Sequence, residues 1–502
     1  MKHGTLRRAA GWGILTLLSS ATVALADPGG WVRRPVRLNI GPGLYGSAIS
    51  MPEDAAVLSD GRSLGLRAVR PVPIAGFVPH IPVGLTNARQ FGEFFYAHQL
   101  VSSLTGTALN PPMSANYAIG VLDTGSTMQV IGTCDRDILG VNAYMTGNTI
   151  PIGGAGGQVD ADVSWPLGFF IAGTQAIDPA TETLNTAAMR GHWQVSVAAL
   201  PDTCGTGPTV STLVGTPLIA FEDVVIRNDT VVTIPTVGAG GPVARYFGPR
   251  VDILPEGSPS TPNYPKDVFL DLQPVGLTTS AYYPDLLNLD FETPWIPTAL
   301  AEYESAIPTG GWFFASVRLT EGSSGELQKL FMMDTGAQVS VVRTFVAGQL
   351  GLDLDNPDFT IEVQGVSGDV TIAKGIYLDT FKVDASGGPM VFSNVPIVVL
   401  DVTSIDGGTL DGIVGTNVFY DRNLALKPGV PVLEVSNPIV NPVPGDYDGD
   451  LDADLADFAA LPECMQGPGV QPAPYFPCVN AFDFDGDGDV DLPDFGAFQR
   501  AL

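Results

Sequence analysis

The chain has 502 residues, a formal net charge of −29 at pH 7 and 45% hydrophobic residues. A chain of this length is too long for one hydrophobic core, so several domains are expected. The excess of acidic residues excludes nucleic acid as a natural partner, because a phosphate backbone recruits basic surfaces. The 59 Gly and 42 Pro favour short strands and turns over long helices, and we therefore predict a mainly β body.

Residues 1–26 have the pattern of a secretory signal peptide. Lys2, Arg7 and Arg8 precede a short apolar run, and small residues before Asp27 form a cleavage site. The run is too short to span a membrane, and no later segment of the sequence is long and apolar enough. We expect a secreted or cell-surface protein with no transmembrane segment.

Residues 27–90 form a basic N-terminal segment, with seven Arg against four acidic residues. One interpretation is that this segment adds strands to the lobe that follows, with its arginines in solvent. The other is a removable pro-segment that lies over an acidic cleft until acid weakens the pairing. The composition leaves both interpretations open.

The first motif that carries chemistry is Asp123-Thr124-Gly125-Ser126, at the end of an apolar strand over residues 117–122. A buried strand that ends here presents the carboxylate rigidly, the Gly lets the backbone turn beneath it, and the Thr hydroxyl can hold the loop. One Asp-Thr-Gly is a weak signal, because ordinary turns use the same residues.

Two features follow the first motif, and all three recur in the same order in the second half of the chain. The second copy is Asp334-Thr335-Gly336-Ala337, delivered by a hairpin that starts near residue 312. An apolar-apolar-Gly pattern ends each copy, at Gly215 and at Gly415. Between motif and pattern lies a glycine-bearing tip, with Gly153, Gly154, Gly156 and Gly157 in the first copy and Gly365 and Gly368 in the second. The repetition predicts a duplicated lobe.

These features divide the chain into segments. We expect a first lobe at 91–235, a loop-rich interlobe insertion at 236–308, a second lobe at 309–436, a Pro-rich linker at 437–445 and an acidic module at 446–502. Because prolines stiffen and extend the linker, we expect it to supply few contacts through which a change in the module could reach the cleft between the lobes.

The C-terminal module contains two twelve-residue loops, at 446–457 and 483–494, that repeat Asp at alternating positions. Carboxylate and carbonyl oxygens at this spacing suit Ca²⁺, whereas a plain acidic surface is the alternative. Leu451 stands where the sharp turn of the first loop favours Gly, so a lower affinity is expected there. The candidate ligands are Asp446, Asp448, Asp450, Asp452, Asp454, Asp457, Asp483, Asp485, Asp487, Asp489, Asp491 and Asp494.

The four cysteines fall into two local pairs. Cys134 and Cys204 lie in the first lobe, and Cys464 and Cys478 lie in the acidic module. Two local disulfides are the simplest pairing in a secreted chain, and zinc binding is the alternative.

The paired Asp-Thr-Gly motifs, glycine-rich tips and following glycines together resemble the bilobal aspartic proteases of the pepsin and retropepsin clan. The resemblance covers roughly residues 90 to 436 and implies two β-barrel lobes. It implies that Asp123 and Asp334 share a proton and activate water to cleave a polypeptide, with no cofactor in catalysis. In that family the tip glycines form flaps. The residues expected to support the catalytic loops are Thr124, Gly125, Ser126, Thr335, Gly336 and Ala337.

The acidic loops resemble a dockerin-type EF-hand module, a small α-helical unit that holds structural Ca²⁺. This resemblance implies a cohesin-like or cell-surface partner, and we expect a monomeric protein of bacterial origin. The alternative function is a non-catalytic, calcium-dependent surface or matrix binding protein that uses the lobes as a scaffold. Intact Asp-Thr pairs in both motifs favour the enzyme.

Overall fold

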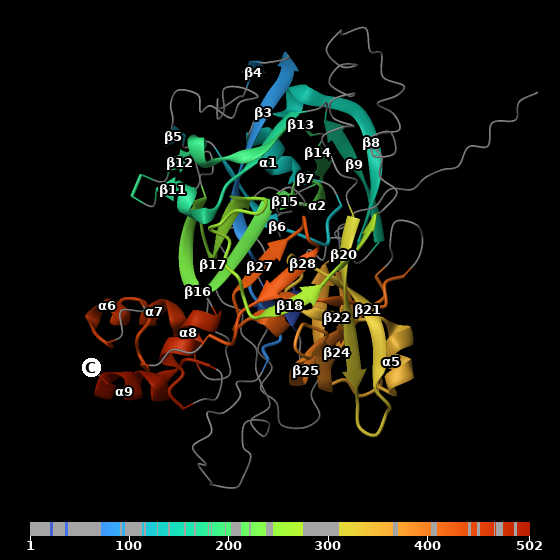
Figure 1. Ribbon diagram of the computed structural model, residues 1–502, viewed down its shortest axis with the longest axis vertical. Helices are drawn as coiled ribbons and strands as arrows, with labels where there is room; N and C mark the ends of the chain where they lie inside the picture. The colour runs from blue at the N-terminus through green and yellow to red at the C-terminus, as the bar shows by residue number, and fades with distance from the viewer. Residues whose placement is uncertain are drawn as a thin grey trace, which may run out of the picture.

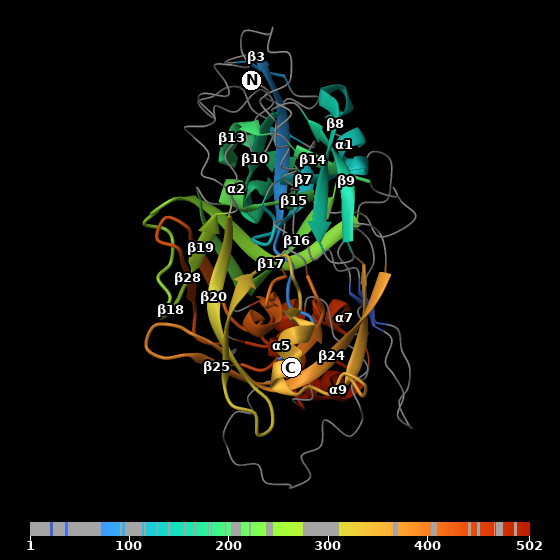
Figure 2. The same ribbon diagram turned by 90° about the vertical axis from the view of Figure 1, so that its right-hand side faces the viewer.

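The computed structural model describes most of the chain from residue 72 onward. The described residues are 21–23, 36–38, 72–90, 93–95, 113–114, 117–127, 129–138, 141–154, 157–164, 167–178, 180–181, 183–195, 197–201, 212–219, 222–236, 244–274, 311–364, 370–402, 409–439, 443–448, 452–465, 467, 475–485 and 489–501. Figure 1 and Figure 2 show two β lobes, one above the other, with a group of short helices beside the lower one. The predicted mainly β architecture is confirmed.

Among the described residues, the first lobe is an open sheet whose strands have three to eleven residues. Its central strand β6 (Ala118–Leu122) is buried along its whole length, as its apolar sequence predicts. The neighbouring strand β15 (Thr212–Val214) runs parallel to β6, which brings the end of the first motif beside Gly215. The sheet order is β13 (Arg190–Val195), β10 (Leu167–Ile171), β3 (His80–Gln90), β6, β15, β7 (Gln129–Gly132), β14 (Val197–Leu200), β9 (Gly157–Ser164) and β8 (Met145–Gly154), with β4 (Glu93–Phe95) beside β3.

The second lobe repeats this arrangement but closes on itself. Its strand β21 (Leu327–Met333), which ends at Asp334, runs parallel to β26 (Gly412–Val414), as β6 does to β15. Because β20 (Gly311–Thr320) pairs with both β21 and β24 (Val370–Val383), six strands form a ring. The sheet order is β19 (Asp271–Pro274), β20, β21, β26, β22 (Ser340–Val342), β25 (Met390–Val399), β24, β23 (Phe359–Gln364), β1 (Ala21–Val23) and β2 (Val36–Leu38).

A third sheet joins the two lobes. It takes β16 (Glu222–Thr236) and β17 (Ala244–Pro255) from the end of the first lobe, and β27 (Leu424–Lys427) and β28 (Val432–Val435) from the end of the second. The edge strand β18 (Lys266–Phe269) pairs with β28. Residues 244–274, predicted as a loop-rich insertion, therefore lie mainly in strands of two sheets. One continuous cluster of buried apolar side chains spans both lobes and this sheet.

Residues 72–90, from the basic N-terminal segment, are built into both lobes. Strand β3 lies between β10 and β6 of the first lobe. Before it, Gly76 exchanges backbone and side-chain hydrogen bonds with Gln338 of the second lobe, at 2.7 and 3.1 Å. A pro-segment that ended at residue 90 would remove an interior strand, so this part of the chain fits the interpretation as added strands. Residues 39–71 lie outside the described residues.

The remaining elements are short. They are the small sheet β11 (Ile177–Asp178), β12 (Thr183–Asn185) and β5 (Met113–Ser114), the 3₁₀ turns η1 (Val141–Tyr144), η2 (Thr174–Ala176), η3 (Thr186–Ala188) and η4 (Thr416–Phe419), and the helices α1 (Thr133–Ile138), α2 (Thr216–Ile219) and α5 (Thr344–Leu350). Among the described residues, no helix is long and apolar enough to cross a membrane.

The C-terminal module contains α6 (Leu455–Phe458), α7 (Leu461–Cys464), α8 (Tyr475–Phe482) and α9 (Leu492–Ala501). A disulfide joins Cys464 to Cys478, as the sequence predicts. The predicted partner of Cys134 lies outside the described residues.

The module and the linker both contact the second lobe. Phe476 of α8 is buried in the main core cluster, with its ring 5.7 Å from that of Tyr420 in the second lobe. The linker adds a hydrogen bond from Ile439 N to Asp421 O at 2.8 Å. The Pro-rich linker does not keep the module apart from the second lobe, because the aromatic side chain of Phe476 packs on an apolar site of that lobe.

Candidate active site

Strands β6 and β21 deliver their aspartates to one place by the same local geometry. The backbone N–H of Asp123 donates to Val214 O at 2.9 Å, and that of Asp334 donates to Val414 O at 3.1 Å. Each carboxylate therefore starts from a backbone fixed by the parallel strand beside it. Both side chains are buried, 2% and 1% exposed respectively.

The turn after Asp123 fixes one carboxylate oxygen. Asp123 Oδ1 accepts hydrogen bonds from Gly125 N at 2.8 Å and from Ser126 N at 3.1 Å. Backbone donors aimed at a carboxylate stabilise its ionised form and hold its orientation.

The turn after Asp334 is a copy of the first. Asp334 Oδ1 accepts from Gly336 N at 2.8 Å and from Ala337 N at 3.2 Å. The match to the first loop lies within 0.1 Å for each bond. Ala337 serves as well as Ser126 here because only its backbone N–H is used.

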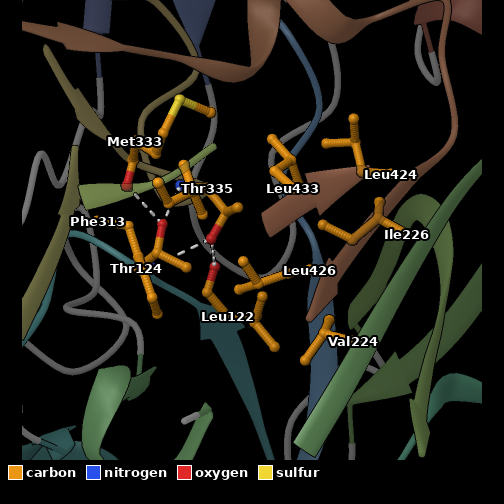
Figure 3. Close-up of a pocket in the computed structure, with 11 residues that line it drawn as sticks. Leu122, Thr124, Val224, Ile226, Phe313, Met333, Thr335, Leu424, Leu426 and Leu433 are labelled. Carbon is orange, nitrogen blue, oxygen red and sulfur yellow. Dashed lines mark hydrogen bonds between the residues drawn. The ribbon is translucent and has the colours of Figure 1, made fainter. Parts of the chain in front are cut away.

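The two threonines cross from one lobe to the other. Thr124 Oγ1 donates to Met333 O at 2.7 Å and accepts from Thr335 N at 3.0 Å. Thr335 Oγ1 donates to Leu122 O at 2.7 Å and accepts from Thr124 N at 3.2 Å. All four groups are buried, so losing either hydroxyl would leave a donor and an acceptor without partners. Figure 3 shows the two hydroxyls side by side.

An apolar layer lies behind the threonines. It lines a small cavity with side chains from the third sheet, among them Val224, Ile226, Leu424 and Leu426 (Figure 3). This layer shields the crossed hydrogen bonds from water, and hydrogen bonds are stronger in such a low-dielectric setting.

The glycine of each loop lies against the carboxyl group of the other lobe. A Cβ on Gly125 would lie 2.5 Å from Asp334 Oδ2, and a Cβ on Gly336 would lie 2.7 Å from Asp123 Cγ. Only hydrogen fits at either place. The structure thus brings Asp123 and Asp334 together, each packed over the other's loop.

Burial and mutual contact change the titration of the pair. Burial raises the pKa of Asp123 well above its usual range, and the charge of Asp334 and a hydrogen bond with it add to that rise. Burial also raises the pKa of Asp334, to about 6, while hydrogen bonds from Asp123 and from the Gly336 and Ala337 N–H groups limit the rise. Two carboxyls in this arrangement hold one proton between them over an acidic range.

The glycine tips belong to hairpins. Gly153 and Gly154 end β8, Gly157 begins β9, and Gly154 pairs with Gly157 across the tip. This hairpin runs from the first lobe toward its junction with the second (Figure 1, Figure 2). The second tip joins the paired strands β23 and β24. Gly156, Gly365 and Gly368 lie outside the described residues.

Several supporting residues escape sequence reasoning. Gln129 binds the first repeat glycine, accepting from Gly215 N at 2.9 Å and donating to Gly215 O at 3.3 Å. In the second lobe Ser340 Oγ accepts from Gly415 N at 3.1 Å and donates to Asn417 Oδ1 at 2.8 Å. The partners are more than 70 residues apart, so no local pattern marks them. Their only sequence signal is a similar distance after each Asp-Thr-Gly.

The acidic loops gather most of their predicted ligands. Their carboxylates form four groups with oxygens within 4.8 Å of one another, two in each loop, that could hold a metal ion. The groups are Asp446 with Asp448 and Asp457, Asp452 with Asp454 and Asp457, Asp483 with Asp485 and Asp494, and Asp489 with Asp491 and Asp494. Asp450 and Asp487 lie outside the described residues. An all-oxygen donor set of this kind fits a hard cation such as Ca²⁺.

The last Asp of each loop is held identically. Asp457 accepts from Tyr447 N at 2.6 Å and from Asp454 N at 2.7 Å. Asp494 accepts from Phe484 N at 2.8 Å and from Asp491 N at 2.9 Å. The two loops are thus repeats in structure as well as in sequence.

Comparison with known proteins gives a family match over part of the chain. Residues 320–418, which include Asp334, match the family model described as Aspartyl protease. A solved structure described as the crystal structure of edgp is similar at 9% sequence identity and a TM-score of 0.32, over 73% of this chain and 96% of that chain. No curated protein matches the sequence.

Proposed function

We propose that the chain is an aspartic endopeptidase that hydrolyses peptide bonds with Asp123 and Asp334 as its catalytic pair. The observation that carries the proposal is the reciprocal packing of the two carboxyl groups over Gly125 and Gly336, within matched hydrogen-bonded loops. A family domain over residues 320–418 adds support for the second half of the site.

The chemistry follows from one shared proton. The ionised carboxyl takes a proton from a water molecule, whose oxygen attacks the peptide carbonyl carbon. The protonated carboxyl donates a hydrogen bond to the carbonyl oxygen as negative charge develops there. When the C–N bond breaks, a carboxyl proton goes to the leaving nitrogen, and the pair again holds one proton. The glycine hairpin between β8 and β9 is proposed to close over the polypeptide as a flap.

The test is hydrolysis of a denatured general protein substrate between about pH 3 and pH 7, where a pair of raised pKa values should be singly protonated. Asp123→Asn serves as the control, because the amide keeps the side-chain shape but cannot share the proton. If the wild-type chain and the control give the same rate, the chemistry lies elsewhere. A folded and inactive wild-type chain would favour the scaffold function instead.

We also propose that the two acidic loops bind Ca²⁺ as a dockerin-like module that attaches the enzyme to a cohesin-like or cell-surface partner. The four carboxylate groups and the matched support of Asp457 and Asp494 favour this assignment. Calcium titration by calorimetry should give two ions per chain. Asp494→Asn should remove one of them without affecting the first loop.

Secretion is proposed on two grounds. The N-terminal residues have the pattern of a signal peptide. The disulfide between Cys464 and Cys478 is typical of oxidising compartments. Mass analysis of the protein recovered from a secreting host should place the new N-terminus near Asp27.

A further inference from the structure

The loop that carries Asp123 receives a hydrogen bond from the other lobe. Trp312, at the start of β20 in the second lobe, donates its indole N–H to Gly125 O at 3.0 Å. The side chain is 6% exposed, so this hydrogen bond is shielded from solvent. A buried indole N–H needs an acceptor, and here it takes one next to the catalytic carboxylate.

The carbonyl that Trp312 contacts belongs to a peptide group with a second role. That peptide joins Gly125 to Ser126, and its N–H donates to Asp123 Oδ1 at 3.1 Å. A continuous chain therefore runs from the indole N–H through one peptide to the carboxylate. A hydrogen bond to the carbonyl polarises the peptide and strengthens the donor at its other end.

The corresponding position of the first lobe holds no such donor. His80 of β3 pairs with Val121, two residues before Asp123, and Phe314 of β20 pairs with Met332, two residues before Asp334. Trp312 precedes Phe314 by two residues, and Val78 precedes His80 by two. Valine has no side-chain hydrogen-bonding group.

We propose that Trp312 is a positioning residue, which holds the Gly125–Ser126 peptide so that its N–H stabilises the ionised form of Asp123. This inference rests on the proposed peptidase function. It assigns the indole a specific electrostatic effect on one carboxylate, beyond filling space between the lobes.

The experiment compares two substitutions that remove the N–H. Trp312→Phe keeps an aromatic ring, and replacement of Trp312 with benzothienylalanine keeps the full indole shape. Both should move the acidic limb of the kcat/KM profile to higher pH by about half a unit. Both should lower kcat several-fold, on the order of 3- to 10-fold, with KM within about twofold.

Phe381→Leu is the matched control. Phe381 is fully buried in the second lobe, and its ring packs against Phe331 at 6.1 Å between centroids. This change should lower the melting temperature without moving the acidic limb, because it destabilises the lobe and leaves the catalytic peptide alone.

A second measurement separates this inference from the proposed function. The titration of the two aspartates is followed by carboxyl ¹³C NMR, which needs no turnover. If the wild-type chain is inactive but both Trp312 variants raise the pKa of the first ionisation of the aspartate pair, the peptidase function fails and the positioning role stands. An unshifted titration in the benzothienylalanine variant overturns the positioning role, whatever the activity.

Discussion

The two Asp-Thr-Gly loops are near copies at their inner surfaces, where they face each other, and differ in part at their outer surfaces. Inside, the Asp, Thr and Gly of each loop make the same contacts with the other lobe. Outside, each loop is held by the threonine after its repeat glycine, with Thr216 N donating to Ser126 O and Thr416 N donating to Ala337 O, both at 2.8 Å. The further contacts differ: the first loop accepts the indole N–H of Trp312, whereas Gln338, just after the second loop, accepts from Gly76 N. The inner contacts must match because each loop is the other's partner, but nothing requires the outer ones to match.

The sheets behind the loops differ in the same way. The second lobe closes into a six-stranded ring, whereas the described part of the first lobe is an open sheet whose strand β3 comes from the basic N-terminal segment. The second lobe is also the part that matches the family model. Both loops nevertheless receive hydrogen bonds from the other lobe, through Thr124, Thr335 and, for the first loop, Trp312. We therefore expect larger effects from substitutions that alter contacts between the two lobes than from substitutions within one lobe.

The largest effect is expected from the carboxyls themselves. Asp123→Asn and Asp334→Asn should each lower kcat by about 10³-fold or more, since an amide can neither accept the water proton nor share one. Both variants should fold, because the amide oxygen can still accept the loop hydrogen bonds. Rates and circular dichroism spectra measured side by side check this. A large difference between the two variants would show that the loops are unequal in chemistry as well as in support.

The next effect comes from the glycines that face the opposite carboxyl. Gly336→Ala would place Cβ 2.7 Å from Asp123 Cγ, and Gly125→Ala would place it 2.5 Å from Asp334 Oδ2. Each should cost about 1 to 3 kcal/mol of folding stability by overpacking and most of the activity. Gly348→Ala is the control, because Gly348 lies in α5 with nothing near its Cβ position. That change should stabilise the protein by about 0.5 to 1 kcal/mol.

The pH dependence of stability tests the buried pair directly. The pKa of Asp334 is raised from 3.8 to about 6, so the fold favours its protonated form. The stability from this shift is fully present below about pH 4 and is lost as pH rises through 6, on the order of 3 kcal/mol. Melting temperatures in constant calcium should fall across this window. The fall should be smaller in Asp334→Asn, and an equal fall in both proteins would assign it to other groups.

The crossed threonines should show a symmetric effect on stability. Thr124→Val leaves Met333 O and Thr335 N without their buried partner, and Thr335→Val does the same to Leu122 O and Thr124 N. Each should lower the free energy of unfolding by about 2 to 4 kcal/mol. The serine variants should restore most of the loss, because the hydroxyl returns. Urea denaturation measures the free energy of unfolding of the valine and serine variants. Unequal losses in Thr124→Val and Thr335→Val would show that one lobe depends more on the crossed hydrogen bonds.

Sequence reasoning located the inner surfaces and missed the outer ones for a physical reason. Asp-Thr-Gly after an apolar strand is a local signal, and its repetition marks both loops. Trp312 and Gly125 are 187 residues apart, and Gln338 and Gly76 are 262 apart, so their contacts exist only after folding. The composition of the segments likewise could not predict that Phe476, beyond the Pro-rich linker, packs against Tyr420 of the second lobe.

The smallest expected effect concerns the acidic C-terminal module, which packs on Tyr420 near the loop of Asp334 and also contacts strand β16. Phe476 packs on Tyr420, which directly follows η4. Within η4, Thr416 N donates to Ala337 O at 2.8 Å, and Asn417 Oδ1 accepts from Ser340 N at 3.0 Å. Loosening the module should therefore reach the loop of Asp334 and leave that of Asp123 unchanged.

Removal of calcium with a chelator tests this. The crowded aspartates should repel one another without a cation, and the small module has little core to oppose that repulsion. Hydrogen exchange should rise at residues 416–420 and stay constant at 122–127, with kcat falling less than about threefold. Phe476→Ala in calcium should reproduce the pattern, whereas Leu455→Ala, at a side chain 75% exposed on the same module, should not. Two outcomes would contradict this expectation. Equal changes at both loops would mean that a disturbance at η4 reaches both carboxyls through their shared inner contacts. No change at either loop would mean that the disturbance reaches neither carboxyl.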